Sequence, residues 1–147
     1  MLPRIFVLAV IASLLAPWPA SPCSCREFTL KESLDRSDAV FVGKVIRLEP
    51  LGVWSFRAIL KPVEVVKGSL PGEVEFVTGV EVPCSFGFDL AETYLVFANR
   101  NDGVLNTSGC SRNGKLKNVI EDLKALGLER LLTNSGTSHT PLPEIPQ

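Results

Sequence analysis

Hydrophobic positions change their spacing along this chain of 147 residues, and that spacing predicts which elements form. Between residues 38 and 106, short runs of β-branched and aromatic residues alternate with turn-forming stretches, a pattern typical of strands. The predicted strands, in order, are Asp38–Leu48, Phe56–Val65, Val74–Thr78, Thr93–Ala98 and Val104–Asn106. The fourth run, TYLVFA, is apolar nearly throughout, which predicts a strand that is buried on both faces.

Irregular positions are expected around these strands. The apolar alternation of the second strand breaks at Lys61-Pro62, which indicates a bulge or bend at a sheet edge, because proline cannot donate a ladder hydrogen bond. The stretch Lys67–Glu73 is predicted to be a connection, and Asn101–Gly103 a tight turn. Trp54 follows the turn region around Pro50 and Gly52; we expect it to pack on the rim of the sheet, with a partner contact as the alternative.

Two regions have helical features. Thr29–Glu32 fits a capping box, in which a hydroxyl and a carboxylate satisfy the first amides of a helix, so a short helix is predicted over Leu30–Arg36. Near the other end, apolar residues recur at helical spacing, and Gly127 is a suitable stop. These residues are Leu116, Val119, Ile120, Leu123 and Leu126, and one further packed turn is predicted at Leu128, Leu131 and Leu132.

Five short strands with a small first helix and a closing helix predict a mainly β fold. A small closed or nearly closed barrel removes exposed sheet edges, and the oligonucleotide/oligosaccharide-binding (OB) type of barrel is one five-stranded solution. A β-sandwich is the alternative that the pattern leaves open.

The two ends of the chain differ from its middle. Arg4 and the apolar run Ile5–Leu15, followed by prolines and small residues, predict a secretory signal over residues 1–22. Ala20 is a better cleavage residue than Pro22, and cleavage there would leave Ser21-Pro22 before Cys23. The run is too short to anchor the chain in a membrane, which takes about 20 apolar residues. We therefore expect one exported domain over residues 23–132, extracellular or, in a bacterium, periplasmic, and a disordered polar tail over residues 133–147.

Charge and composition exclude several functions. The formal net charge is −1, and it becomes more negative by one unit when Arg4 is removed with the leader. The sequence also has no basic stripe, so nucleic acid is not expected as a partner. The single histidine, His139, lies in the predicted tail, and the chain has no Cys-x-x-Cys, HExxH or phosphate-loop motif. We therefore expect neither an enzyme nor a cofactor or metal ion of its own.

The four cysteines begin with the pair Cys23-Ser24-Cys25. An even number of cysteines in an exported chain favours two disulfides. In an extended segment the side chains of Cys23 and Cys25 point to the same side in parallel, so each prefers a separate partner, and Cys84 and Cys110 are available. A redox pair is disfavoured, because among the immediate neighbours only Arg26 would lower a thiol pKa.

The order of several motifs resembles a known family. Cys-x-Cys, AVFVGKVI, VEVVKG, VPCSFGF, ETYLVFA and NDGVLNTSGCS resemble, from Cys23 to about Leu126, the N-terminal inhibitory domain of tissue inhibitors of metalloproteinases and, more broadly, netrin-like (NTR) domains. The resemblance implies an OB barrel with flanking helices and the disulfides Cys23–Cys84 and Cys25–Cys110. A third disulfide and a cysteine-rich C-terminal domain, usual in that family, are missing, so the chain resembles a short, single-domain member.

The resemblance also implies a function, the inhibition of zinc metalloendopeptidases by a monomer. The α-amine and carbonyl of Cys23 would chelate the catalytic zinc of the protease, whose open position normally holds water. Ser24 would enter the specificity pocket, Cys25 and Arg26 would follow the cleft, and Glu81-Val82-Pro83 would line the second half of the contact. The alternative is a non-inhibitory interaction module, whose two disulfides only stabilise the barrel. In either case, no contact with a membrane is expected after the leader is removed.

Overall fold

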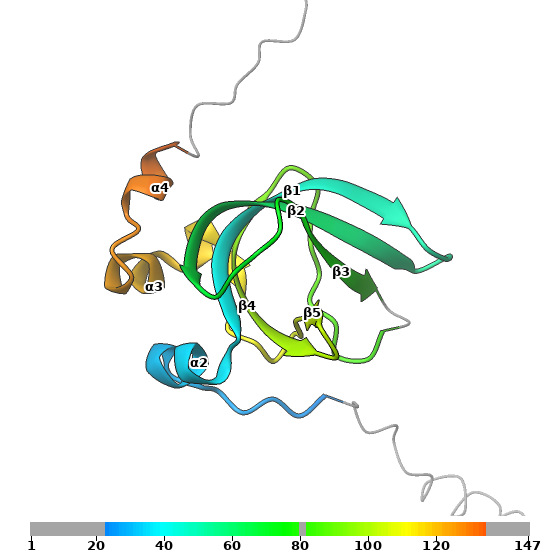
Figure 1. Cartoon of the computed structure of the whole chain (residues 1–147), viewed down its shortest axis with the longest axis horizontal. Coiled ribbons are helices and arrows are strands. Elements are labelled where there is room, and N and C mark those ends of the chain that lie inside the picture. Colours follow the sequence, from blue (N-terminus) through cyan, green and yellow to red (C-terminus); the bar gives the residue numbers. More distant parts are fainter. Residues whose placement is uncertain (1–22, 80–81, 135–147) are drawn as a thin grey trace, which may run out of the picture.

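A strongly curved antiparallel sheet forms the body of the protein in the computed structural model, which describes residues 23–79 and 82–134 (Figure 1). The strand order is β3-β2-β1-β4-β5, with β6 beside β4. The strands are β1 (Ala39–Pro50), β2 (Ser55–Lys67), β3 (Val74–Gly79), β4 (Thr93–Asn101), β5 (Val104–Asn106) and β6 (Gly114–Lys115). Because β3 also contacts β5, the sheet curls into a barrel. The predicted mainly β, barrel-like fold is confirmed, although β6 was not predicted.

The central strands β1 and β4 separate two hydrophobic cores. Phe41 and Val96 point into the barrel, whereas Val42 and Leu95 point outward to the helices. All four side chains are fully buried, as predicted for the apolar run in β4. Burial on both faces explains why neither strand has an alternating pattern of apolar and polar residues.

An aromatic cluster holds the loop after β3 against the barrel. Phe88, from this loop, stacks on Phe76 of β3 with ring centroids 5.6 Å apart, and meets Tyr94 of β4 edge to face at 5.2 Å. Phe86 also meets Tyr94 edge to face, at 5.7 Å. Such aromatic pairs stabilise beyond the area that they bury. The loop is therefore anchored to the inner core on the side that carries Cys84.

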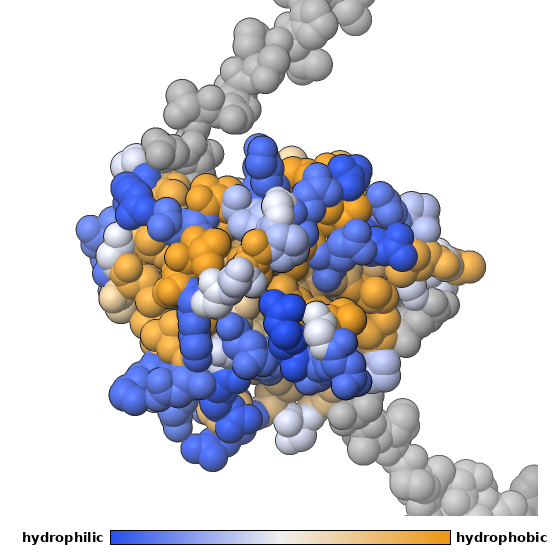
Figure 2. Space-filling view, in the orientation of Figure 1, coloured by the Kyte–Doolittle hydropathy of each residue, from blue (hydrophilic) through white to orange (hydrophobic). Residues whose placement is uncertain are grey.

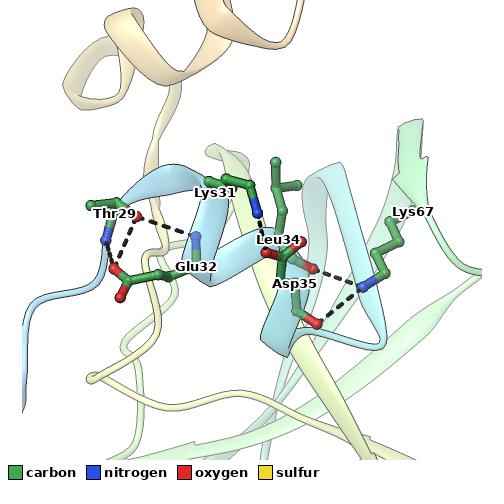
Figure 3. Close-up of polar contacts among 6 residues, drawn as sticks. All are labelled: Thr29, Lys31, Glu32, Leu34, Asp35 and Lys67. Carbon is green, nitrogen blue, oxygen red and sulfur yellow. Dashed lines mark hydrogen bonds and ion pairs between the residues drawn. The ribbon is translucent and has the colours of Figure 1, made fainter.

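Helix α2 (Leu30–Arg36) begins at the predicted capping box (Figure 3). The Glu32 amide donates to Thr29 Oγ1 at 3.2 Å, and the Thr29 amide donates to Glu32 Oε2 at 2.9 Å. At the other end of the helix, Lys67 Nζ from the end of β2 donates to the carbonyl oxygen of Leu34 at 2.7 Å. A cation is favourable beside the unsatisfied carbonyls of a helix C-terminus, so this bond ties α2 to the sheet.

The predicted irregularity in β2 is confirmed. Val42 lies opposite Glu64 and Gly43 opposite Pro62, so Val63 is an extra residue in this strand. Strand β3 pairs with β2 only along residues 55–60, so Pro62 lies in a part of β2 that is paired with β1 alone, an edge position where proline is tolerated. The expectation that Trp54 packs on the rim of the sheet is wrong, because this residue, at the end of the β1–β2 hairpin, is 62% exposed.

The single closing helix predicted over residues 116–126 is also wrong in detail. A 3₁₀ helix, η1 (Leu116–Asn118), precedes α3 (Ile120–Ala125), and Val119 between them has the non-helical angles φ −121° and ψ 32°. The tighter 3₁₀ turn lets Leu116 and Leu123 both reach the outer core, whereas Ile120 is left exposed. Gly127, with φ +71°, ends α3 as expected.

The predicted further turn is present as α4 (Arg130–Asn134), which includes the first two residues of the predicted tail. The predicted leader, His139 and the rest of the tail lie outside the described residues. Within the described part of the chain, no helix is both long and apolar enough to cross a membrane.

Candidate functional site

The segment before α2, residues 23–29, runs along the outside of the barrel without regular secondary structure (Figure 1). Cys23 is partly buried, whereas Ser24, Cys25 and Arg26 are exposed. Both cysteines of the segment are bonded to the barrel, so it is an exposed main-chain segment attached at two neighbouring points. We call residues 23–26 the N-terminal ridge.

Two disulfides attach this ridge. Cys23 is bonded to Cys84 in the loop after β3, with Cα atoms 5.7 Å apart, and Cys25 to Cys110 in the loop after β5, with Cα atoms 5.1 Å apart. No cysteine is left free in the described chain, which contains all four. This pairing is the one implied by the family resemblance, and each cysteine of the Cys-x-Cys pair has a separate partner, as the extended geometry predicted.

The two anchoring loops are bonded to each other. Gly109 precedes Cys110, and its backbone amide donates to the carbonyl oxygen of Cys84 at 2.7 Å. A Cβ at Gly109 would lie 3.3 Å from the carbonyl oxygen of Ser85, so glycine suits this close approach of two backbones. The ridge is therefore attached to one joined platform rather than to two independent loops.

Polar side chains attach the second loop to β4. Asn113 Oδ1 accepts from the amide of Phe97 at 2.8 Å, and Asn113 Nδ2 donates to Thr107 Oγ1 at 2.8 Å. Thr107 Oγ1 in turn donates to the carbonyl oxygen of Phe97 at 2.7 Å. These bonds pair both the amide and the carbonyl oxygen of Phe97, a core residue, so they define the position of the Cys110 loop against the sheet.

The first loop is attached in a similar way. Ser85 Oγ donates to the carbonyl oxygen of Gly79 at 2.8 Å and accepts from its amide at 3.1 Å. Val82 is partly buried and Pro83 is exposed beside the cystine, whereas Glu81 lies outside the described residues. Of the residues expected to form the second half of the contact, the structure thus brings Val82 and Pro83 next to the Cys23 anchor.

Arg112 fixes the continuation of the ridge. Its Nη1 donates to the carbonyl oxygen of Phe28 at 2.9 Å, and the rest of its guanidinium binds the carboxylate of Asp122 in α3. The hydrogen bond with Asp122 raises the pKa of Arg112, so this group stays positively charged. The guanidinium groups of Arg26, in the ridge, and of Arg36 lie over the ring of Phe28, at 5.3 and 4.4 Å from its centroid.

Sequence reasoning missed the residues that support the ridge, namely Thr107, Gly109, Arg112 and Asn113. Their only local signal is their position beside Cys110 in the polar run NTSGCSRN. Among residues 23–79 and 82–134, no three His, Cys, Asp or Glu side chains lie together in a way that could hold a metal ion. The exposed residues of the ridge are Ser24, Cys25 and Arg26, so the surface it presents carries a small polar side chain, a cystine and a basic side chain.

Comparison of the chain with models of known protein families gives no match, and comparison with curated proteins gives none either.

Proposed function

We propose that this protein is a secreted inhibitor of zinc metalloendopeptidases and a binding protein rather than an enzyme. In this proposal the α-amine nitrogen and the carbonyl oxygen of Cys23 form a chelate on the catalytic zinc of the protease. The observation that carries the proposal is the attachment of the exposed N-terminal ridge, through Cys23 and Cys25, to a rigid and internally bonded platform. A pre-organised main-chain segment loses little conformational entropy when it enters a cleft.

The geometry of the ridge supports a substrate-like mode of binding. Ser24, Cys25 and Arg26 are exposed in sequence order, and Pro83 is exposed beside the Cys23 anchor. A protease cleft accepts an extended main chain, but these disulfides hold the ridge to the barrel on both sides of Ser24. In the proposed complex Ser24 enters the specificity pocket next to the zinc, and Val82 and Pro83 contact the other half of the cleft.

The chelate needs a free amine at Cys23. An α-amine has a pKa of about 7.7 to 8.0, so an appreciable fraction is neutral near pH 7 and can give its lone pair to zinc. A preceding residue would convert this amine to an amide, whose delocalised lone pair is a poor ligand. The two residues Ser21-Pro22 would therefore have to be removed if the leader is cut after Ala20.

The decisive experiment compares three forms of the protein, which start at Cys23, at Ser21, and at an alanine added before Cys23. Each is titrated against a panel of zinc endopeptidases after both disulfides have been confirmed by peptide mapping. Only the form that starts at Cys23 should inhibit, and its inhibition should weaken as the pH falls below 7 and the amine becomes protonated. Equal inhibition by all three forms would contradict amine chelation. Inhibition by none would favour the non-inhibitory interaction module.

A second experiment tests whether the side chain of Ser24 contacts the protease, by comparing a substitution in the ridge with one elsewhere on the surface. Ser24→Asp places a charge where the specificity pocket would receive the side chain, and it should weaken inhibition by about tenfold or more, which corresponds to about 1.4 kcal/mol. Ser69→Asp, at an exposed residue of the β2–β3 connection, is the matched control and should leave inhibition unchanged. Similar losses in both variants would argue against contact through Ser24.

A further inference from the structure

The β1–β2 hairpin ends in an exposed apolar tip, residues 51–54, which we call the hairpin tip. Leu51, Val53 and Trp54 are 47%, 76% and 62% exposed, and Gly52 separates the first two. The hairpin extends beyond the barrel, and Figure 2 shows hydrophobic surface at its far end (Figures 1 and 2). Single exposed apolar residues are common, but three within four consecutive residues at a projecting end call for an explanation.

The hairpin tip has few polar side-chain groups, and two of its backbone amides are bonded within the hairpin. The amides of Leu51 and Gly52 both donate to the carbonyl oxygen of Ser55, at 2.9 and 3.3 Å. The only side-chain hydrogen-bonding group in Leu-Gly-Val-Trp is the indole N–H of Trp54. Backbone groups that are bonded internally can enter an apolar medium at low cost. For these two amides and for the side chains of Leu51 and Val53, leaving water therefore costs no hydrogen bond.

Charged residues begin directly behind the tip, and they are paired with one another. Arg47 lies 2.9 Å from Glu73 and 3.5 Å from Glu49, and Arg57 lies 3.3 Å from Glu49 and 3.5 Å from Glu75. This ladder crosses the outer face of β1 and β2 to Glu75 of β3 and to Glu73 just before β3, and it contains one more carboxylate than guanidinium. It thus presents closely spaced charges of both signs, next to an apolar end.

We propose that the hairpin tip inserts into the interface of a zwitterionic lipid bilayer. Its apolar side chains would reach the acyl boundary, the indole of Trp54 would sit at headgroup level, and the charge ladder would face the phosphate and ammonium groups of the lipid. Tryptophan is enriched at this depth because its ring is apolar and its N–H can bond. The lengths of the apolar runs in the sequence predicted no membrane contact after the leader is removed; the contact proposed here is peripheral and needs no spanning segment.

Two features favour lipid over a protein pocket as the occupant. A specific binding site normally uses several directional polar groups to set orientation, and among its side chains the hairpin tip offers only the indole N–H. The projecting, convex shape suits a fluid surface that can close around it. The excess carboxylate of the ladder further favours neutral over anionic lipid, because attraction to anionic lipid requires basic residues.

The test uses the chain from Cys23 to Gln147, which contains both hydrophobic cores and in which Trp54 is the only tryptophan. The emission maximum of Trp54 and co-sedimentation are measured with phosphatidylcholine vesicles and with vesicles that also contain phosphatidylserine. The tip variant is Leu51→Ser with Val53→Ser, which keeps the fluorophore. The control is Leu90→Ser with Val104→Ser, two residues of similar exposure (59% and 62%) outside the tip.

A blue shift with phosphatidylcholine, insensitive to 0.5 M salt and no stronger with phosphatidylserine, is expected. The tip variant should partition about tenfold more weakly or worse, whereas the control should bind like the unaltered chain. No shift with either vesicle, or equal partitioning by the tip and control variants, would overturn the proposal. A shift that only a zinc endopeptidase produces would also overturn it, because the occupant would then be a protein.

Discussion

Arg112 and Asp122 form a two-bond ion pair between the Cys110 loop and helix α3. Nε and Nη2 of the guanidinium lie 2.7 and 2.9 Å from the two carboxylate oxygens, and Asp122 is buried. The remaining nitrogen of Arg112 holds the carbonyl oxygen of Phe28. One side chain therefore joins the segment that follows the N-terminal ridge, an anchoring loop and the outer core, and planar guanidinium suits this role better than an ammonium group.

Arg112→Ala should lower the free energy of unfolding by about 2 kcal/mol, because it leaves the buried carboxylate of Asp122 without its partner. The loss should be smaller than for a fully buried pair, since the Arg112 side chain is 40% exposed. Lys124→Ala removes the exposed pair with Glu121 and serves as the control, with a much smaller expected loss because solvent screens this pair. Urea unfolding measures both, and equal losses would contradict the special role of Arg112.

Replacing Cys25 and Cys110 by alanine should destabilise the domain by about 2 to 4 kcal/mol, because this bridge closes a long loop in the unfolded chain. The same variant should release the segment around Arg26, which would appear as faster amide hydrogen exchange there than in the core strands. Peptide mapping must show that Cys23–Cys84 is intact. Unchanged exchange in the ridge would mean that one bridge is sufficient to hold it.

Gly79→Ala should unfold at a clearly lower denaturant concentration, with a loss of at least about 2 kcal/mol. Gly79 has φ +135°, a backbone conformation that residues with a Cβ rarely adopt, and an added Cβ would clash with the carbonyl oxygen of Trp54. Gly87→Ala is the control, since a Cβ there meets nothing within 4 Å; its effect should stay below about 1 kcal/mol. Similar midpoints for the two variants would contradict the close packing at the base of the hairpin tip.

The carboxyl group of Asp89 should make the free energy of unfolding depend on pH in the acidic range. Hydrogen bonds from Lys115 and Tyr94 lower the pKa of its carboxyl group below the ordinary value. A lowered folded-state pKa stabilises the protein above the unfolded pKa of about 3.9, and this contribution is lost as the pH falls through the folded value. The stability difference between the unaltered protein and Asp89→Asn should therefore be present at pH 7 and shrink at pH 3.

A double-mutant cycle identifies the cause of that pH dependence. In a Lys115→Gln background, where the strongest hydrogen bond to Asp89 is absent, Asp89→Asn should have a smaller effect at pH 7. Urea midpoints of the four proteins at both pH values provide the measurement. An undiminished effect in the Lys115→Gln background would assign the stabilisation to Tyr94 or to the loop backbone instead.

Elements whose cause lies within a few residues could be predicted from the sequence. The capping box at Thr29 and Glu32, the stop at Gly127 and the irregularity at Pro62 all follow from local hydrogen bonding or backbone conformation. Strand β4 was also recognisable, since an apolar run of this length has few alternatives once helical spacing is excluded. The Cys-x-Cys pair likewise predicted two separate disulfide partners from the geometry of an extended segment.

Other features depended on which distant residues meet, and only the tertiary structure decided them. The bond from Arg112 to Phe28 spans 84 residues of sequence, and the approach of Gly109 to Cys84 joins two loops on different strands. The break at Val119 arises because both Leu116 and Leu123 must reach one core, and Trp54 stays exposed because the hairpin extends past the barrel. Helix and strand propensities amount to fractions of a kcal/mol for each residue, whereas the burial of an apolar side chain contributes more. Burial and contacts between loops depend on partners that the local sequence does not contain.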